Sequence, residues 1–268
     1  MDALRRIDEW GAPHAAALLV RSGNSVSSHG PRDHVFRWAS VTKLVTALAA
    51  LLAAEEGVID LDEPAGPEGA TVRHLLAHAS GLPFEPGAPT SKPGERRVYS
   101  NVGFETLAEH VAARAEMPFG DYLSAGVLRP LGMHAELRGS PASELHGTLD
   151  DLRALARELQ RPSLVAEETL GEATSVQFSG LAGVLPDFGR FDPLDWGLGF
   201  ELRNGKDPHW TGGRNSPRTF GHFGGSGTFL WVDPEAGVAL GVLTDRDFGP
   251  WAKNAWPQLS DAVLAEET

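Results

Sequence analysis

The chain has 268 residues and a mass of 28.6 kDa, enough for one large or two modest domains with a sizeable buried core. Its 23 Lys and Arg residues against 36 Asp and Glu residues give a net charge of −13, a sign that repels nucleic-acid phosphates and anionic lipid. We therefore expect neither nucleic acid nor a membrane as a partner. The absence of cysteine excludes disulfides, a thiol nucleophile, thiolate zinc sites and iron-sulfur clusters.

The first elements are predicted to be a helix and a hairpin. Residues 2–10 have the pattern of a short charged helix that ends at Gly11 and Pro13, and residues 15–20 and 25–28 form two strand-like runs around Gly23 and Asn24. The charged start lacks the apolar core of a signal peptide, and residues 15–20 are too few to span a bilayer. As given, the chain is expected to be cytoplasmic, although a leader trimmed away beforehand would not be visible.

The middle of the chain is predicted to be mostly helical. A long, buried helix begins at Ser40 and ends at Gly57, because apolar residues recur between them at helical spacing. Further helices are expected at 72–78 with Thr71 as N-cap, 102–115 with Asn101 as N-cap, 118–128 and 148–160.

The last quarter has the pattern of strands. Residues 197–203, 227–232 and 237–244 are predicted strands, residues 233–237 a turn, and residues 250–265 a final amphipathic helix. The fold class is therefore α+β. An antiparallel sheet flanked by N- and C-terminal helices is expected from residues 1–39 and 196–268, and residues 40–195 form an inserted, mostly helical domain. The active site is expected in the cleft between the two parts.

Ser40 and Lys43 open the long helix one turn apart and on one face, so that a hydroxyl lies beside an amine. Lysine can take a proton from serine when burial or a neighbouring cation lowers its pKa, and the N-terminus of a helix favours a developing oxyanion. The alternative is a helix cap followed by a lysine that reaches solvent. The apolar helix around Lys43 argues against that alternative.

Two further motifs lie downstream. Tyr99-Ser100-Asn101 precedes a helix, and a phenol held near an ammonium group can act as an acid or a base; otherwise this is a surface turn with a capping Asn101. His222-Phe223-Gly224-Gly225 is a glycine-rich edge that enters a strand and lets a ligand approach the backbone. Alone, such a histidine is more often structural.

Neither a metal nor another cofactor is expected. The acidic groups at residues 60–63 and 150–151 are typical of turns and helix starts. His74 and His78 are four residues apart and could hold zinc, but the sequence lacks a His-Glu-x-x-His pattern, so packing is the preferred explanation.

Taken in order, the three motifs resemble those of the serine β-lactamase and penicillin-binding protein superfamily, in its class C β-lactamase, DD-peptidase and family VIII esterase branch. Residues 40–43 match the SxxK motif, residues 99–101 the YxN motif and residues 222–224 the K/HxG motif. Residues 74–83, 93–94, 130–133 and 148–156 also resemble stretches usual in this branch, and the likeness covers residues 34–246. The resemblance implies a β-lactamase/transpeptidase-like fold.

The resemblance also implies roles for individual residues. Ser40 is the expected nucleophile, Lys43 and Tyr99 share the proton transfers, and water hydrolyses the acyl-enzyme. Asn101 is expected to hold Lys43 and the substrate, and the N–H groups of Ser40 and Gly225 to form the oxyanion hole. Where β-lactamases commonly have Lys and Thr, this chain has His222 and Phe223, next to Gly224.

The resulting hypothesis is a serine hydrolase that acts on small-molecule esters or amides, with small esters favoured over β-lactams. A true β-lactamase or D-amino-acid peptidase is the second hypothesis. A catalytically silent ligand-binding or sensor module is the third, and the retention of Ser40, Lys43 and Tyr99 argues against it. The natural substrate and the oligomeric state stay open at this stage.

Overall fold

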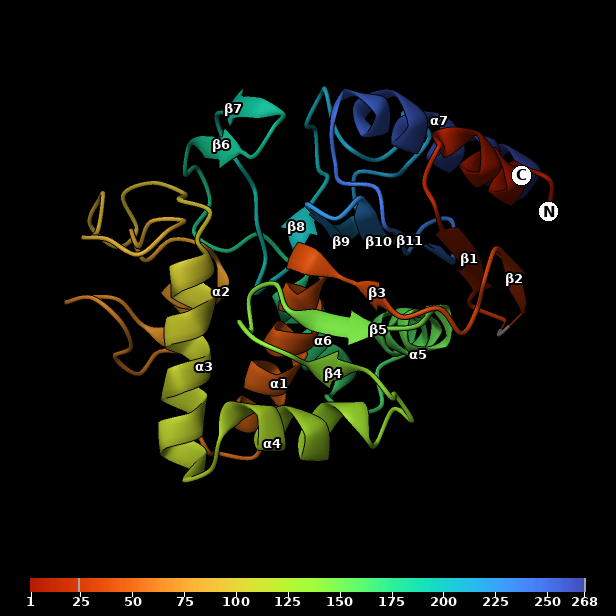
Figure 1. Ribbon diagram of the computed structural model, residues 1–268. Coiled ribbons are helices and arrows are strands. Elements are labelled where there is room, and N and C mark those ends of the chain that lie inside the picture. Colours follow the sequence, from red (N-terminus) through yellow and green to blue (C-terminus); the bar gives the residue numbers. More distant parts are fainter. Residues whose placement is uncertain (24, 268) are drawn as a thin grey trace.

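A computed structural model of the protein describes residues 1–23 and 25–267. Within these residues the main sheet has six antiparallel strands in the order β2-β1-β11-β10-β9-β8. The predicted N-terminal hairpin therefore does join the C-terminal strands, as Figure 1 shows. Its turn includes Asn24, which lies outside the described residues. The strands are β1 (Ala15–Arg21), β2 (Val26–His29), β8 (Glu201–Leu202), β9 (Phe220–Gly224), β10 (Thr228–Asp233) and β11 (Val238–Thr244).

Helices cover both faces of this sheet. The terminal helices η1 (Ala3–Trp10) and α7 (Pro250–Glu267) pack on each other and on one face, over a core rich in aromatic rings that includes Trp231 and Trp256. Helix α5 (Leu149–Gln160) packs against β1, β10 and β11 on the other face. The central strands are buried on both sides for this reason, and β10 and β11 are buried along their whole length and mostly apolar.

Helix α1 (Thr42–Glu55) runs through the centre of the helical part and is buried on almost all sides (Figure 1). The short 3₁₀ turn η2 (Ala39–Val41) leads into it. Around it lie α2 (Val72–Leu76), α3 (Asn101–Ala115), α4 (Phe119–Leu123), the π-helical turn η3 (Ser124–Leu128) and α6 (Glu167–Ala173). Two small sheets complete this part: β3 (Phe36–Arg37), β5 (Leu145–Gly147) and β4 (Glu136–Leu137), and the pair β6 (Gly183–Leu185) and β7 (Gly189–Phe191).

The α+β class and the order of elements are as predicted, and the differences are local. The Ser100 side chain, and not that of Asn101, caps α3 by accepting a hydrogen bond of 2.7 Å from the Gly103 N–H. The expected cap role of Asn101 is wrong because its side chain turns inward to a lysine, described below. The strand predicted at 197–203 shrinks to β8, and residues 220–224 form a full strand. Among the described residues no helix combines the length and apolarity that crossing a bilayer requires.

Candidate active site

Ser40 lies in the tight turn η2 at the start of α1. The residue before it, Ala39, has a positive φ of 45°, a conformation that costs energy for a residue with a Cβ atom and therefore needs support from its surroundings. Strand β9 supplies this support. A Cβ atom at Gly224 would lie 2.5 Å from the Trp38 carbonyl oxygen and 3.0 Å from the Ala39 Cβ, so glycine is required for the strand to pass behind the turn.

Lys43 is fully buried, and its Nζ atom has three oxygen neighbours. The distances are 2.6 Å to Asn101 Oδ1, 2.9 Å to the Ala142 carbonyl oxygen and 3.3 Å to Ser40 Oγ. A neutral amine has two N–H donors and one lone pair. Because Asn101 and Ala142 present acceptors only at these contacts, they take the two donors and leave the lone pair for the Ser40 hydroxyl.

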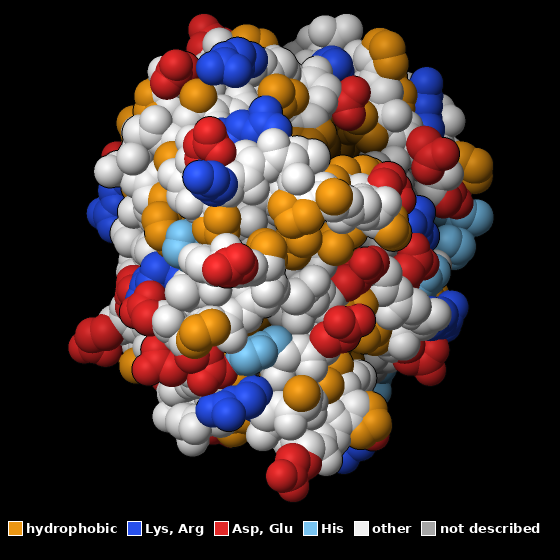
Figure 2. All heavy atoms as spheres, turned by 90° about the vertical axis from the view of Figure 1, so that its left-hand side faces the viewer, with side chains coloured by type: hydrophobic (Ala, Val, Ile, Leu, Met, Phe, Trp, Pro, Cys, Tyr) orange, Lys and Arg blue, Asp and Glu red, His pale blue; other side chains and the backbone are white. Residues whose placement is uncertain are grey.

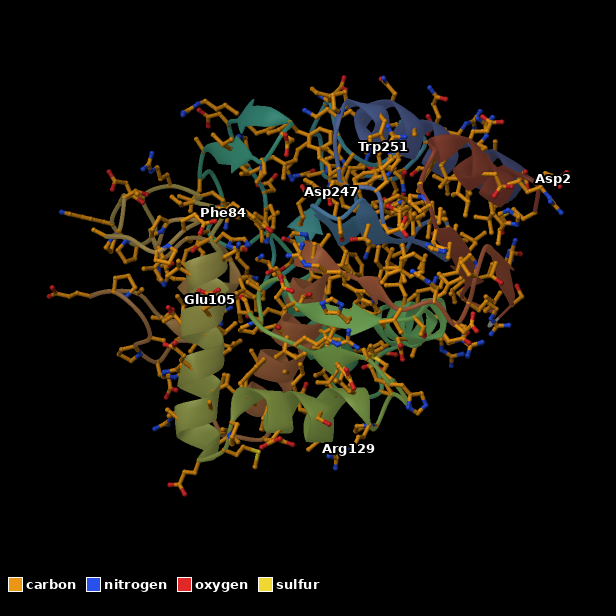
Figure 3. All side chains as sticks on the ribbon, viewed as in Figure 1. Asp2, Phe84, Glu105, Arg129, Asp247 and Trp251 are labelled. Atoms are coloured by element: carbon orange, nitrogen blue, oxygen red, sulfur yellow. The ribbon has the colours of Figure 1, made fainter. Side chains whose placement is uncertain are left out.

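The electrostatics of the site favour this neutral amine. Burial lowers the pKa of Lys43 to about 7, and the more distant Glu105 carboxylate opposes the shift. In Figure 3 Glu105 lies near the upper, N-terminal end of α3, the helix that also carries Asn101. A substantial share of Lys43 is therefore deprotonated at neutral pH, which an exposed lysine is not.

Tyr99 lies over the same amine, with Lys43 Nζ 4.9 Å from its ring centroid. Burial raises the pKa of the Tyr99 phenol above its usual value, and a hydrogen bond with Ser40 only partly opposes this shift. The phenol oxygen is also 3.4 Å from His222 Nε2. Tyr99 is therefore a protonated phenol in the resting site, placed between Ser40 and His222.

His222 is neutral. Burial, with a smaller effect from nearby Lys43, lowers the pKa of His222 to about 3. Its Nδ1 atom lies 2.7 Å from the Phe223 carbonyl oxygen, which can only accept, so the proton is on Nδ1 and the Nε2 lone pair faces Tyr99. Position 222, where a lysine would supply a permanent positive charge, therefore carries no charge at neutral pH.

The side chains around Ser40 enclose a small, mainly apolar cavity of about 160 Å³. It is lined by Ser40, Phe84, Tyr99, Leu185, Pro186, Asp187, Trp196, Glu201, His222, Phe223, Gly225 and Phe248. An outer groove of about 800 Å³ shares Phe84, Tyr99, Pro186 and Asp187 with it. Figure 2 shows hydrophobic side chains gathered across the middle of the face that carries α3, with a hollow above them. A larger cavity of about 930 Å³ is lined by Arg32, Asp33 and several residues within 130–134 and 148–167, and it does not include Ser40.

The glycines of the third motif do different things. Gly225 borders the cavity, and a Cβ atom there would meet nothing within 4 Å, so its backbone is open to a ligand. Gly224 does not line the cavity and instead allows the close approach to residues 38–39. Phe223, which precedes these glycines, borders the cavity and also belongs to the core, since its ring packs on Phe248 and on Trp256 of α7.

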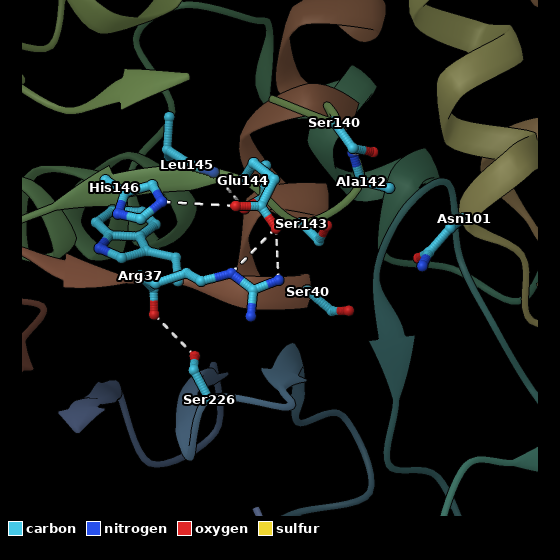
Figure 4. A network of polar contacts seen from close by, with 12 residues as sticks. Arg37, Ser40, Asn101, Ser140, Ala142, Ser143, Glu144, Leu145, His146 and Ser226 are labelled. Carbon is cyan, nitrogen blue, oxygen red and sulfur yellow. Dashed lines mark hydrogen bonds and ion pairs between the residues drawn. The ribbon is translucent and has the colours of Figure 1, made fainter. Parts of the chain in front are cut away.

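A polar network beside Ser40 joins the three-stranded sheet β3-β5-β4 to the loop that carries Gly225 (Figure 4). The Arg37 guanidinium donates to Glu144, and His146 Nε2 lies 3.6 Å from the same carboxylate. The Ser226 hydroxyl donates to the Arg37 carbonyl at 2.8 Å. These bonds fix the position of Gly225 relative to the segment before Ser40. The Ala142 carbonyl, which binds Lys43, lies close by.

Several site residues carry no sequence signal. The Ala142 carbonyl is a backbone group, and the rings of Phe84 and Trp196, which are distant in sequence, both pack against Tyr99. Figure 3 shows Phe84 close to the upper end of α3.

Glu201 is a buried carboxylate at the cavity wall. Burial alone would raise its pKa, but His209 and Lys206 outweigh this effect and lower it to about 2. Lys206 Nζ lies 2.7 Å from Glu201 Oε1.

The two histidines considered for zinc lie in separate environments. His74 Nδ1 is 2.9 Å from the Thr71 hydroxyl oxygen at the start of α2. His78 Nδ1 accepts the Ser100 N–H at 3.2 Å, and its ring packs against Tyr99 at a centroid distance of 4.6 Å. His78 therefore supports Tyr99 from behind.

Comparison with known proteins identifies the family and the fold. The family model described as Beta-lactamase matches residues 4–264. A crystal structure described as a beta-lactamase from Mycobacterium bovis is 53% identical, covers 99% of each chain and superposes with a TM-score of 0.97. EstCE1, a hydrolase with promiscuous acyltransferase activity, is 18% identical over 98% of this chain and 97% of its own, with a TM-score of 0.77, which shows a shared fold.

Curated relatives match over shorter stretches. The D-alanyl-D-alanine-carboxypeptidase/endopeptidase AmpH of Escherichia coli (strain K12) is 30% identical over 42% of this chain and 39% of its own length. A penicillin-binding protein of Bacillus subtilis (strain 168) is 28% identical over 38% of this chain and 30% of its own length. The matched part is therefore well under half of each of these relatives.

Proposed function

The chain belongs to the Beta-lactamase family of serine hydrolases, and from this premise we propose that it cleaves neutral, apolar esters through an acyl-Ser40 intermediate. The observation that carries the proposal is the contact of Ser40 with a buried Lys43 whose pKa is close to neutral. The proposal includes the division of the chain into residues 1–39 with 196–268 and residues 40–195, with the substrate bound between these parts.

In the first step Lys43 acts as the base. Its neutral amine takes the Ser40 hydroxyl proton while the serine oxygen attacks the substrate carbonyl carbon, and the N–H groups of Ser40 and Gly225 stabilise the oxyanion. Tyr99 then donates its phenol proton to the leaving alcohol oxygen as the carbon–oxygen bond breaks. The Lys43 ammonium returns a proton to Tyr99, so the acyl-enzyme has the same protonation state as the free enzyme.

Hydrolysis of the acyl-enzyme reverses these transfers. A water molecule loses a proton to the basic pair and attacks the acyl carbon, and the Ser40 oxygen leaves with a proton from Lys43. Asn101 and the Ala142 carbonyl keep the Lys43 amine in place throughout, because they bind its two remaining hydrogens. No cofactor takes part in these steps.

Neutral esters are proposed as the preferred class because the cavity offers apolar surface and little charge compensation. Phe84, Trp196 and Phe248 line it, and His222 is neutral. A carboxylate near the third motif would lose water without gaining a cation, which costs about 1–3 kcal/mol. The adjoining groove of about 800 Å³ leaves room for a larger acyl or alcohol group.

The test compares two substrates. We expect kcat/KM for p-nitrophenyl butyrate to exceed that for nitrocefin, which carries a carboxylate, and His222→Lys to move the ratio at least about tenfold toward nitrocefin by adding a cation. Phe223 stays in place in this variant because its ring is part of the core under α7. Wild-type turnover of nitrocefin at a higher kcat/KM than the ester would favour the second candidate, a β-lactamase or D-amino-acid peptidase related to the carboxypeptidases above.

Tyr99→Phe should lower kcat/KM by about a hundredfold on an alkyl ester, whose leaving group needs a proton. The loss should be smaller on a p-nitrophenyl ester, because p-nitrophenolate leaves without protonation. Paired assays of the two esters measure this difference. Equal losses on both substrates would show that Tyr99 does not protonate the leaving group. Tyr122→Phe is the matched control, because Tyr122 does not line the cavity.

A further inference from the structure

We propose that His14, His34 and Asp245 form a binding site for a divalent transition-metal ion such as zinc. One ligand atom from each of these three side chains lies within 4.8 Å of the other two. Two imidazole nitrogens and a carboxylate oxygen are a donor set that first-row transition metals such as zinc prefer, whereas calcium and magnesium prefer oxygen alone. The three residues take no part in the hydrolytic site described above.

Secondary structure brings the three ligands together from distant parts of the chain. His14 immediately precedes β1 and Asp245 immediately follows β11, and these strands are paired so that Ala15 lies opposite Thr244. Figure 1 shows the two strands side by side. His34 comes from the segment that leads into β3. The three residues are far apart in the sequence, so their convergence could not be predicted from it, and no metal was expected.

The backbone and side-chain contacts hold the carboxylate toward the imidazoles. Asp245 Oδ1 accepts the His14 backbone N–H at 2.8 Å, and Asp245 Oδ2 lies 2.6 Å from His14 Nδ1. The His34 ring stacks on the His14 ring with centroids 4.1 Å apart and an interplanar angle of 22°. The edge of Phe36 supports His34 from the other side at 4.5 Å. The residue that carries each donor is thus positioned by a second contact.

The spacing suits a metal after small side-chain movements. Zinc lies about 2.0–2.2 Å from nitrogen and oxygen ligands, so tetrahedral ligand atoms are separated by about 3.3 Å. His14 Nδ1 and Asp245 Oδ2, now 2.6 Å apart, must move apart, and the His14 and His34 rings must turn out of their stack, because a metal lies in the plane of each imidazole that binds it. Both movements are available because these side chains lie at the surface, where His14 is half exposed. A fourth position is open to water.

A bound metal would act on stability and not on the chemistry. It would tie the N-terminal segment and the β3 approach to the end of β11. Metal binding should therefore raise the melting temperature while changing ester turnover little.

The experiment uses the untagged full chain, freed of metal with a chelator, and zinc chloride as the probe. Calorimetric titration is expected to give one zinc per chain, and zinc should raise the melting temperature by several degrees. His34→Ala and Asp245→Asn should each weaken zinc binding at least tenfold. His29→Ala is the matched control, because His29 forms a similar exposed pair with Asp8, at 2.8 Å, in the same domain.

Each metal-free variant is also assayed for ester turnover, because turnover at the wild-type rate shows that the variant is folded. The proposal is overturned if the wild type binds no zinc, if His34→Ala and Asp245→Asn bind it as the wild type does, or if His29→Ala reduces binding as much as they do. Should His34→Ala fail to fold, His34→Gln, which keeps the ring's approximate length and a polar end, takes its place.

Discussion

Ser40→Ala is expected to abolish turnover of p-nitrophenyl butyrate and labelling by a fluorescent acylating probe. The expected effect is this large because the serine oxygen forms the covalent bond to the substrate, and among the described residues no other serine or threonine lines the cavity. Mass spectrometry of the labelled wild type should place the added mass on the peptide that contains Ser40.

Ser28→Ala is the matched control, since Ser28 lies on the exposed face of the edge strand β2. It should keep wild-type labelling and turnover. Persistent labelling of Ser40→Ala, with the probe on another residue, would contradict the assignment of the nucleophile. Labelling of the wild type without release of the label would instead support a ligand-capturing protein that no longer turns over.

Lys43→Ala should reduce kcat/KM by at least about a hundredfold, and the wild type should lose activity as the pH falls through about 7. The direction follows from the charge: below the pKa of Lys43 the amine is protonated and cannot accept the serine proton, and above it the neutral base is present. His78 and His222 also face this amine. Burial lowers the pKa of both well below this range, so they stay neutral and do not produce the transition.

Glu105→Gln separates this explanation from other causes of the pH profile. The Glu105 carboxylate raises the pKa of Lys43, so its neutralisation should move the activity transition to lower pH. Glutamine keeps an oxygen that can accept the Ser140 hydroxyl, now 2.6 Å from Glu105 Oε1. Steady-state kcat/KM from pH 5 to 9 measures the shift, with Lys92→Ala on the surface as control. A shift to higher pH, or an unchanged profile, would show that Lys43 is not the titrating base.

Local patterns were sufficient to predict several features. Ser40 and Lys43 lie on one face because their spacing is close to one helical turn, and the apolar helix around them made burial of Lys43 predictable. The strands 15–20 and 237–244 could be recognised from runs of apolar residues. The helix predicted over residues 148–160 is α5, at whose start Thr148 accepts the Asp151 N–H, a contact within one turn. Each of these depends only on residues close in sequence.

The extent of β9 and the cap of α3 could not be predicted in this way. Phe220–Gly224 forms a strand because it is inserted between β8 and β10, whose partners supply its hydrogen bonds. Asparagine is a good helix cap, but the Asn101 side chain turns toward Lys43 and Ser100 caps the helix instead. The reason is that the buried Lys43 amine donates a hydrogen bond of 2.6 Å to Asn101 Oδ1. Tertiary contacts outweighed local preference in both places.

The sequence by itself determined the class of the fold, the buried helix that carries Ser40 and Lys43, and the motifs that resemble one family. Only the tertiary structure decided that the Ala142 carbonyl binds Lys43, that burial keeps His222 neutral, and that His14, His34 and Asp245 meet. The physical reason is the range of the interactions involved. Helical spacing and apolar runs are local properties of the chain, whereas burial, pKa and the convergence of ligands arise from segments that become neighbours only on folding.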